Sequence, residues 1–109
     1  MITLYIAGPM TGLPDRNYPA FHGAEKVLLK AGFQVENPAH NTGEKWTDYL
    51  RASVVQIARC DGVALLPGWS ESRGACVEVR LAVSLELRIS TVEEWAEAGE
   101  RAERLGGGS

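Results

Sequence analysis

The sequence predicts an α/β domain in which a parallel sheet of four or five strands is covered by helices on both faces. Short runs of β-forming apolar residues alternate with stretches of helical spacing, four times along the chain. This alternation is typical of right-handed β–α–β units, which build parallel sheets. The length of 109 residues fits one domain, which we place at 1–105, with 106–109 as a tail or linker.

The first half of the chain predicts a strand, a helix and a second strand. Residues 2–7 are apolar and rich in β-formers, and the Gly-Pro pair that follows ends them. Residues 19–31 have helical spacing, with Pro in the first turn and Gly just after the end. Residues 33–36 form the second predicted strand, which an Asn-Pro pair interrupts.

The second half repeats the alternation twice. Thr47 is the predicted N-cap of a helix whose apolar positions are Leu50, Val54, Ile57 and Ala58. Thr91 and Glu94 form a capping box for a last, acidic helix. Between these two helices, the predicted elements are a strand at 63–66, a helix from 72 and a short strand at 87–90.

The distribution of charge excludes partners with a polyanionic backbone. The net charge is −3, and residues 91–105 hold five Glu against two Arg, which accounts for all of it. The rest of the chain is balanced and has no basic stripe. We therefore expect no nucleic-acid polymer as a partner.

Cysteine usage and the N-terminus predict a cytoplasmic protein. Cys60 and Cys76 form no CxxC pair, and no His stands at zinc-ligand spacing, so we expect a reducing compartment and no metal. Residues 1–10 lack the positive start of a signal peptide and reach Gly and Pro too early to span a membrane.

Three loops leave the carboxyl ends of the predicted strands, where parallel sheets bind their ligands. They are GPMTG (8–12), NPAH (37–40) and PGWSESRG (67–74). These loops supply the predicted substrate-binding residues, which are Gly8, Pro9, Met10, Asn37, Trp69, Ser72 and Gly74. The other polar residues considered, Asp15, Arg16, His40 and Asp61, are expected to be solvated or to serve turns.

Glu78 is the candidate catalytic residue because of the direction in which it points. On a helical plot it shares the side of Leu81 and Ala82, opposite Arg73. A Glu is rarely buried unless it is paired or functional. The alternative is a carboxylate that merely complements the dipole near the helix N-terminus.

The residues around Glu78 each have a structural and a functional interpretation. Ser72 is either only an N-cap or, with Gly74 leaving the backbone open, part of a phosphate cradle. Tyr5 is either a core residue or a hydrogen-bond donor that orients a carboxylate. Trp46 and Trp69 either stack on a planar base or pack as a lid.

Four stretches resemble a phage and bacterial family of uncharacterised domains, which is similar to a branch of the nucleoside 2-deoxyribosyltransferase superfamily. They are YIAGPMTG (5–12), NYPAF (17–21), CDGVALLPGW (60–69) and SRGACVE (72–78), and the likeness covers about residues 2–90. The resemblance implies a small flavodoxin-like or Rossmann-like three-layer sandwich. It also implies cleavage of an N-glycosidic bond without a metal or an organic cofactor.

The resemblance assigns roles to the two catalytic candidates. Glu78 corresponds to the nucleophile that attacks the anomeric carbon, and Tyr5 to the tyrosine that orients it. The pattern S-x-G-x-x-x-E, met here by Ser72, Gly74 and Glu78, is similar to that of the branch that hydrolyses nucleoside 5′-monophosphates. The implied substrate is a small-molecule nucleotide or nucleoside with its phosphate at Ser72.

One departure from the resemblance leaves other functions open. Similar sequences have R-A-D where this chain has Arg51-Ala52-Ser53, and that Asp is thought to assist the leaving base. Whether Asp48 substitutes is left open. The alternatives are a nucleotide-binding or sensing module without turnover, and a phage–host interaction protein that uses the helix from 91 as its contact surface. Size and family also predict a homo-oligomer, a dimer or larger.

Overall fold

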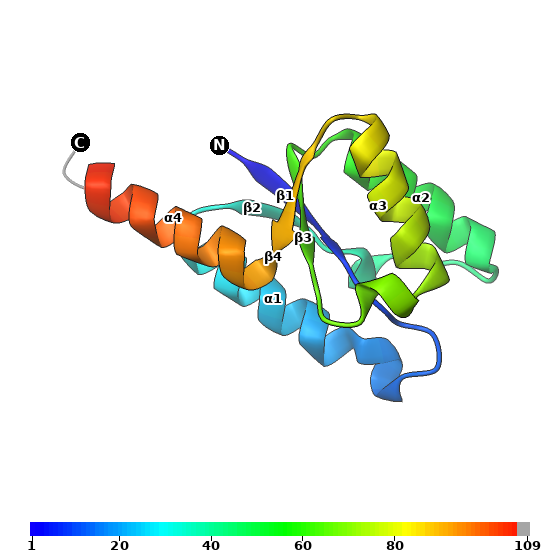
Figure 1. Ribbon diagram of the computed structural model, residues 1–109. Coiled ribbons are helices and arrows are strands. Elements are labelled where there is room, and N and C mark those ends of the chain that lie inside the picture. Colours follow the sequence, from blue (N-terminus) through cyan, green and yellow to red (C-terminus); the bar gives the residue numbers. More distant parts are fainter. Residues whose placement is uncertain (107–109) are drawn as a thin grey trace.

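The computed structural model describes residues 1–106 as four strands and four main helices. The predicted tail lies outside the described residues, except for Gly106, which ends the last helix. No helix within residues 1–106 combines the length and the apolar character needed to cross a membrane. The elements, labelled in Figure 1, are β1 (Thr3–Ala7), α1 (Tyr18–Lys30), β2 (Gln34–Glu36), α2 (Trp46–Ala58), β3 (Gly62–Leu65), α3 (Arg73–Ser84), β4 (Arg88–Thr91) and α4 (Val92–Gly106), with short 3-10 helices at Pro14–Asn17, Pro38–His40 and Trp69–Glu71.

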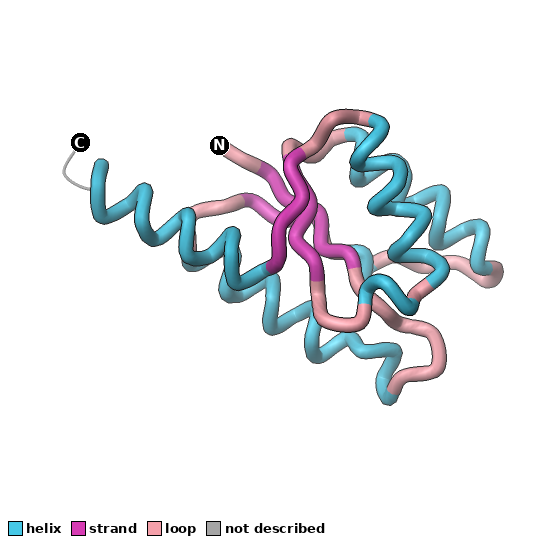
Figure 2. The backbone as a smooth tube through the Cα atoms, viewed as in Figure 1, coloured by secondary structure: helices cyan, strands magenta, loops and turns pink. Residues whose placement is uncertain are grey.

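The sheet confirms the predicted α/β sandwich. Its four strands are all parallel, in the order β2-β1-β3-β4, consistent with a flavodoxin-like or Rossmann-like fold. Helices α1 and α4 pack together on one face, and α2 and α3 on the other (Figure 1). The loops that leave β1 and β3 lie at the same end of the sheet (Figure 2).

Strand β1 shows why the sheet has two separate cores. Successive side chains of a strand point to opposite faces. Leu4 and Ile6 therefore join the core under α1 and α4, whereas Tyr5 and Ala7 join the core under α2 and α3. All four side chains are fully buried. The alternation directs the Tyr5 side chain to the α2/α3 face of the sheet.

The start and the rotation of α2 differ from the prediction. The helix begins at Trp46, and the Asp48 carboxylate caps it by accepting the backbone N–H groups of Glu44 and Lys45, at 3.1 and 2.9 Å. Thr47 is therefore not the cap. The helix buries Ser53 with Ile57, while Val54 is 39% exposed. The predicted apolar face was wrong in part because Ser53, a polar residue, faces the core.

The last helix has a core face as well as an acidic one. The predicted capping box is confirmed, since Thr91 and Glu94 exchange hydrogen bonds at 2.9 and 3.1 Å. Trp95 is 3% exposed, and its indole N–H donates to the carbonyl of Val63 at 2.8 Å. Deleting α4 would therefore open the core. A role for this helix in binding a partner must be tested through substitutions on its acidic face.

Close packing of α4 on α1 gives a first stability prediction, for Gly99→Ala. A Cβ at Gly99 would lie 2.5 Å from the carbonyl oxygen of Ala31 and 2.8 Å from the Phe33 ring. We expect Gly99→Ala to lower the free energy of unfolding by about 2 kcal/mol, because the helices must separate. Urea unfolding measures this. The control is Gly23→Ala in α1, where a Cβ meets nothing within 4 Å. This substitution should raise the free energy of unfolding by about 0.5–1 kcal/mol. An equal rise in the free energy of unfolding in both variants would contradict the prediction.

Candidate functional site

A pocket of about 290 Å³ opens at the carboxyl end of the sheet. This volume is close to the lower limit of small-molecule sites. The loops after β1, β2 and β3 all contribute to its wall, as a parallel sheet predicts. The lining residues are Gly8, Met10, Thr11, Arg16, Phe21, Pro38, Asn41, Glu44, Trp46, Tyr49, Leu50, Ser53, Ser72, Gly74, Ala75 and Glu78.

Glu78 lies on the pocket wall, where Tyr5 forms a hydrogen bond to its carboxylate. The glutamate, on the second turn of α3, is 9% exposed, and Tyr5 on β1 is fully buried. The Tyr5 hydroxyl donates to Oε2 of Glu78 at 2.5 Å. The predicted inward direction of Glu78 is therefore observed, and the two catalytic candidates are in direct contact.

Burial and hydrogen bonding act on the Glu78 carboxyl in opposite directions. Burial raises its pKa to about 7, while hydrogen bonds from Tyr5 and Ser53 lower the pKa. Burial, reinforced by the charge of Glu78, raises the pKa of the Tyr5 hydroxyl well above its ordinary value. Near pH 7 the carboxyl group thus exists in both ionised and neutral forms, and Tyr5 remains a donor.

Ser72 and Gly74 lie on the same wall, six and four residues before Glu78. The Ser72 hydroxyl accepts the backbone N–H of Ala75 at 3.2 Å, which confirms that Ser72 caps α3. Gly74 has ordinary helical geometry, so its backbone does not require glycine. A Cβ at this position would face Trp46, with the indole nitrogen 3.7 Å away. The missing side chain therefore leaves space in the pocket.

Arg16 is exposed, as expected from the sequence, and it also contributes to the pocket wall. Among the described residues that line the pocket, it is the only cationic one. Its guanidinium carbon lies 5.0 Å from the centre of the Tyr49 ring. Sequence patterns give little sign of this position, because Asp15, Arg16 and Asn17 all adopt left-handed φ values of 51°, 51° and 61°. Asp and Asn tolerate left-handed φ values better than most residues, so Asp15 and Asn17 were the only indication in the sequence of this turn.

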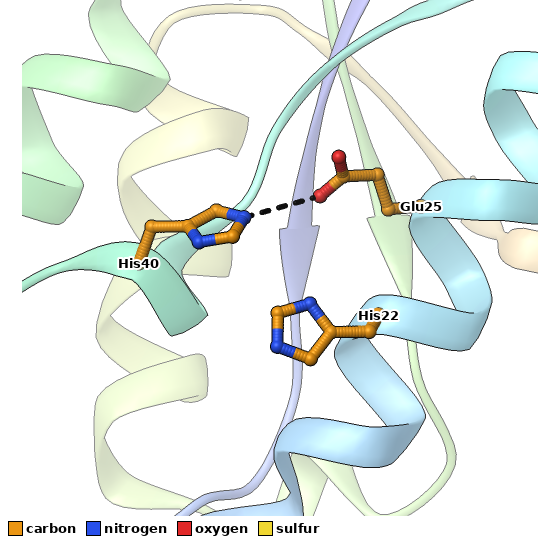
Figure 3. Close-up of side chains that lie close together, drawn as sticks. All are labelled: His22, Glu25 and His40. Carbon is orange, nitrogen blue, oxygen red and sulfur yellow. Dashed lines mark ion pairs between the residues drawn. The ribbon is translucent and has the colours of Figure 1, made fainter.

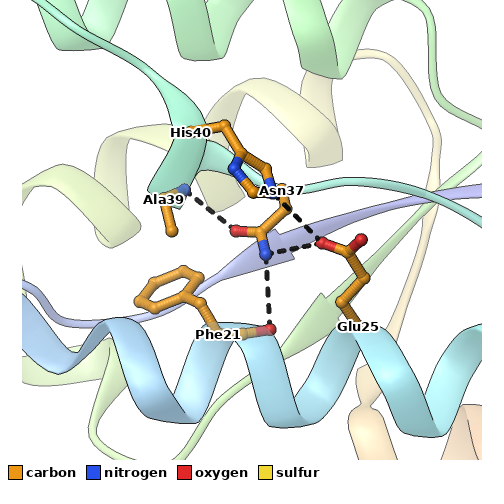
Figure 4. Close-up of polar contacts among 5 residues, drawn as sticks. All are labelled: Phe21, Glu25, Asn37, Ala39 and His40. Carbon is orange, nitrogen blue, oxygen red and sulfur yellow. Dashed lines mark hydrogen bonds and ion pairs between the residues drawn. The ribbon is translucent and has the colours of Figure 1, made fainter.

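Other predicted substrate-binding residues lie away from the pocket wall. Asn37 is 4% exposed and uses its side chain in the scaffold, bonding to α1 and to the backbone N–H of Ala39 (Figure 4). Trp69, in a 3-10 helix, lines neither the pocket nor the groove beside it. Pro9 lines that adjoining groove, of about 790 Å³. The predicted residues on the pocket wall are Gly8, Met10, Ser72, Gly74 and Glu78.

The structure shows where Ser53 and Asp48, the two positions considered for a proton donor, lie relative to Glu78 and the pocket. Ser53, the departure from R-A-D, is 4% exposed and lies beside Tyr5 and Glu78. Asp48 caps α2 and does not line the pocket, so its carboxylate has a structural use. The second carboxylate on the pocket wall is Glu44, just before α2.

Comparison with known families matches most of the chain. The model of a family described as "Domain of unknown function (DUF4406)" matches residues 2–91. This span contains the four strands and every residue that lines the pocket. Comparison with curated proteins finds no match. The family description names no activity.

Proposed function

The chain belongs to this DUF4406 family of unknown function, and we propose that it cleaves the N-glycosidic bond of a (deoxy)nucleoside 5′-monophosphate. The observation that carries the proposal is the Glu78 carboxyl, buried at the wall of a pocket and hydrogen-bonded by Tyr5. A buried acid with a raised pKa in a cleft is a frequent mark of a catalytic group. The resemblance to nucleoside 2-deoxyribosyltransferases supports the same role.

The proposed reaction passes through a covalent glycosyl intermediate. The ionised Glu78 carboxylate attacks the anomeric carbon, the C–N bond breaks, and its electron pair leaves with the base. The base takes up a proton from water. A second water molecule then attacks the same carbon and loses a proton to the solvent, which releases the sugar phosphate and restores the Glu78 carboxylate. A second base in place of water would make the enzyme a transferase.

Two features of the pocket favour a substrate with a 5′-phosphate. Ser72, Gly74 and Ala75, at the N-terminus of α3, line the same pocket as Glu78, and a helix N-terminus attracts anions. Arg16 adds a positive charge to the same pocket. Trp46 and Tyr49 supply aromatic surface to the wall, on which a base can stack.

The proposed function is tested by incubating the chain with a panel of deoxynucleotides and deoxynucleosides. The release of free base is measured by chromatography. For Ser72→Ala we expect kcat/KM on monophosphates to fall about tenfold, because a hydrogen bond to a charged group is lost. The value on nucleosides should change little. The matched control is Ser70→Ala, two residues earlier and outside the pocket wall. Failure of the unmodified chain to release base from any member would reject the proposal.

Ser53 favours a second candidate, a nucleotide-binding module without turnover. Its hydroxyl stands beside Glu78 where similar sequences have an acid that assists the leaving base. This candidate predicts saturable binding of a nucleoside monophosphate in calorimetry, with no base released over hours. Base release that depends on Glu78 would exclude it.

A further inference from the structure

The fold brings together both histidines of the chain and one glutamate, none of which lines the pocket just described. His22 and Glu25 lie on α1, and His40 ends the 3-10 helix after β2 (Figure 3). The possible ligand atoms of the three side chains all lie within 4.8 Å of one another. Nε2 of His40 is 3.5 Å from Oε1 of Glu25, and the two imidazole rings are 5.2 Å apart.

We propose that His22, Glu25 and His40 bind a divalent transition metal, with Zn²⁺ as the preferred ion. Two imidazoles and one carboxylate form a ligand set that zinc commonly uses, with a fourth position left for water. Bonds of about 2.0–2.1 Å in a tetrahedron place ligand atoms about 3.3 Å apart. The 3.5 Å between His40 and Glu25 nearly meets this requirement. The exposed His22 ring closes the remaining gap by side-chain rotation.

Asn37 holds the carboxylate of this cluster in place. Its side-chain amide donates to Oε1 of Glu25 at 2.7 Å and to the carbonyl of Phe21 at 3.4 Å, and it accepts the N–H of Ala39 at 2.9 Å (Figure 4). A carboxylate oxygen can accept a hydrogen bond and bind a metal together. Metal-binding carboxylates usually have such a partner. The buried Asn37 thus fixes the position of the Glu25 carboxylate and of the backbone at Ala39, just before His40.

The position of the cluster gives the metal a bracing role. It would join α1 to the segment after β2, two parts of the chain separated by 18 residues at His22 and His40. Their neighbours Phe21 and Pro38 line the pocket. A bound ion would therefore stabilise one wall of the pocket. This inference does not depend on the proposed reaction.

The first test is calorimetric titration of the chain, without an affinity tag, with Zn²⁺ alone. We expect one ion per chain, and an affinity at least about tenfold lower in His22→Gln, His40→Gln and Glu25→Gln. Glu100→Gln on α4, outside the cluster, is the control for the loss of one negative charge. Binding should weaken as the pH falls, because a protonated imidazole cannot bind a metal.

The second test separates this cluster from the cysteines. Burial raises the pKa of the Cys60 thiol to about 12, which makes it a poor ligand, so Cys76 is the competing thiol. Cys76→Ser should bind Zn²⁺ as the unmodified chain does, and Co²⁺ spectra should lack thiolate charge-transfer bands. A hundredfold excess of Zn²⁺ over Kd should raise Tm by roughly 5 °C or more. Equal Zn²⁺ affinity in a His22→Gln/His40→Gln double variant, or no binding by the unmodified chain, would overturn the proposal.

Discussion

Glu78→Gln should reduce the release of base from a deoxynucleoside monophosphate at least about a thousandfold, because an amide cannot attack the anomeric carbon. The substitution keeps the size of the side chain, and its amide oxygen can still accept the hydrogen bond from Tyr5. The pocket should therefore keep its shape. Single-turnover measurements with saturating substrate separate this loss of chemistry from any change in binding.

The controls show whether Glu78 acts as the nucleophile or whether any loss of negative charge lowers turnover. Glu103→Gln, an exposed residue on α4, removes the same charge far from the pocket wall and should leave kcat unchanged. In the unmodified chain, kcat/KM should rise with pH through about 7, as the Glu78 carboxyl of the free enzyme ionises. Undiminished base release by Glu78→Gln would remove Glu78 from the reaction, even if the chain proved to be a glycosidase.

The parts of the fold that follow a regular period could be predicted from the sequence. The period of two in β1 and the helical period in α3 turn Tyr5 and Glu78 toward each other, because burial of the neighbouring apolar residues fixes both elements. The caps at Ser72 and Thr91 were equally local signals. Such features depend on a few adjacent residues and on no distant contact.

The parts that were missed depend on tertiary contacts. The left-handed turn that brings Arg16 to the pocket is held by Asn17, whose amide donates to the carbonyl of Pro9 at 3.0 Å. Ser53 faces inward because Tyr5 and Glu78 offer it polar partners, which a hydrophobic pattern cannot show. The predicted homo-oligomer, likewise a matter of distant surfaces, stays a prediction, which light scattering can test.

Glu78→Gln should also make the protein more stable at pH 8, by about 3 kcal/mol in the free energy of unfolding. Burial raises the carboxyl pKa from its ordinary value of 4.5 to about 7 in the fold, so the fold favours the protonated form. The stability that this confers is complete below pH 4.5 and is lost as the pH rises through 7. The difference between a pKa of 4.5 and one of about 7 corresponds to about 3 kcal/mol. Urea unfolding at pH 4.5, 6 and 8 measures the growing difference between the variant and the parent chain.

Glu94 provides a control of opposite sign for this measurement. Its hydrogen bonds, first from the backbone N–H of Thr91, lower the carboxyl pKa, so they stabilise the fold at neutral pH and lose this effect in acid. Glu94→Gln should therefore lower stability at pH 8, where Glu78→Gln raises it. A residue kept for structure alone would not lower stability in its ionised form. A single substitution that removes turnover and raises stability would mark Glu78 as a group retained for chemistry. A loss of stability in Glu78→Gln at pH 8 would instead make the Tyr5–Glu78 contact a structural one.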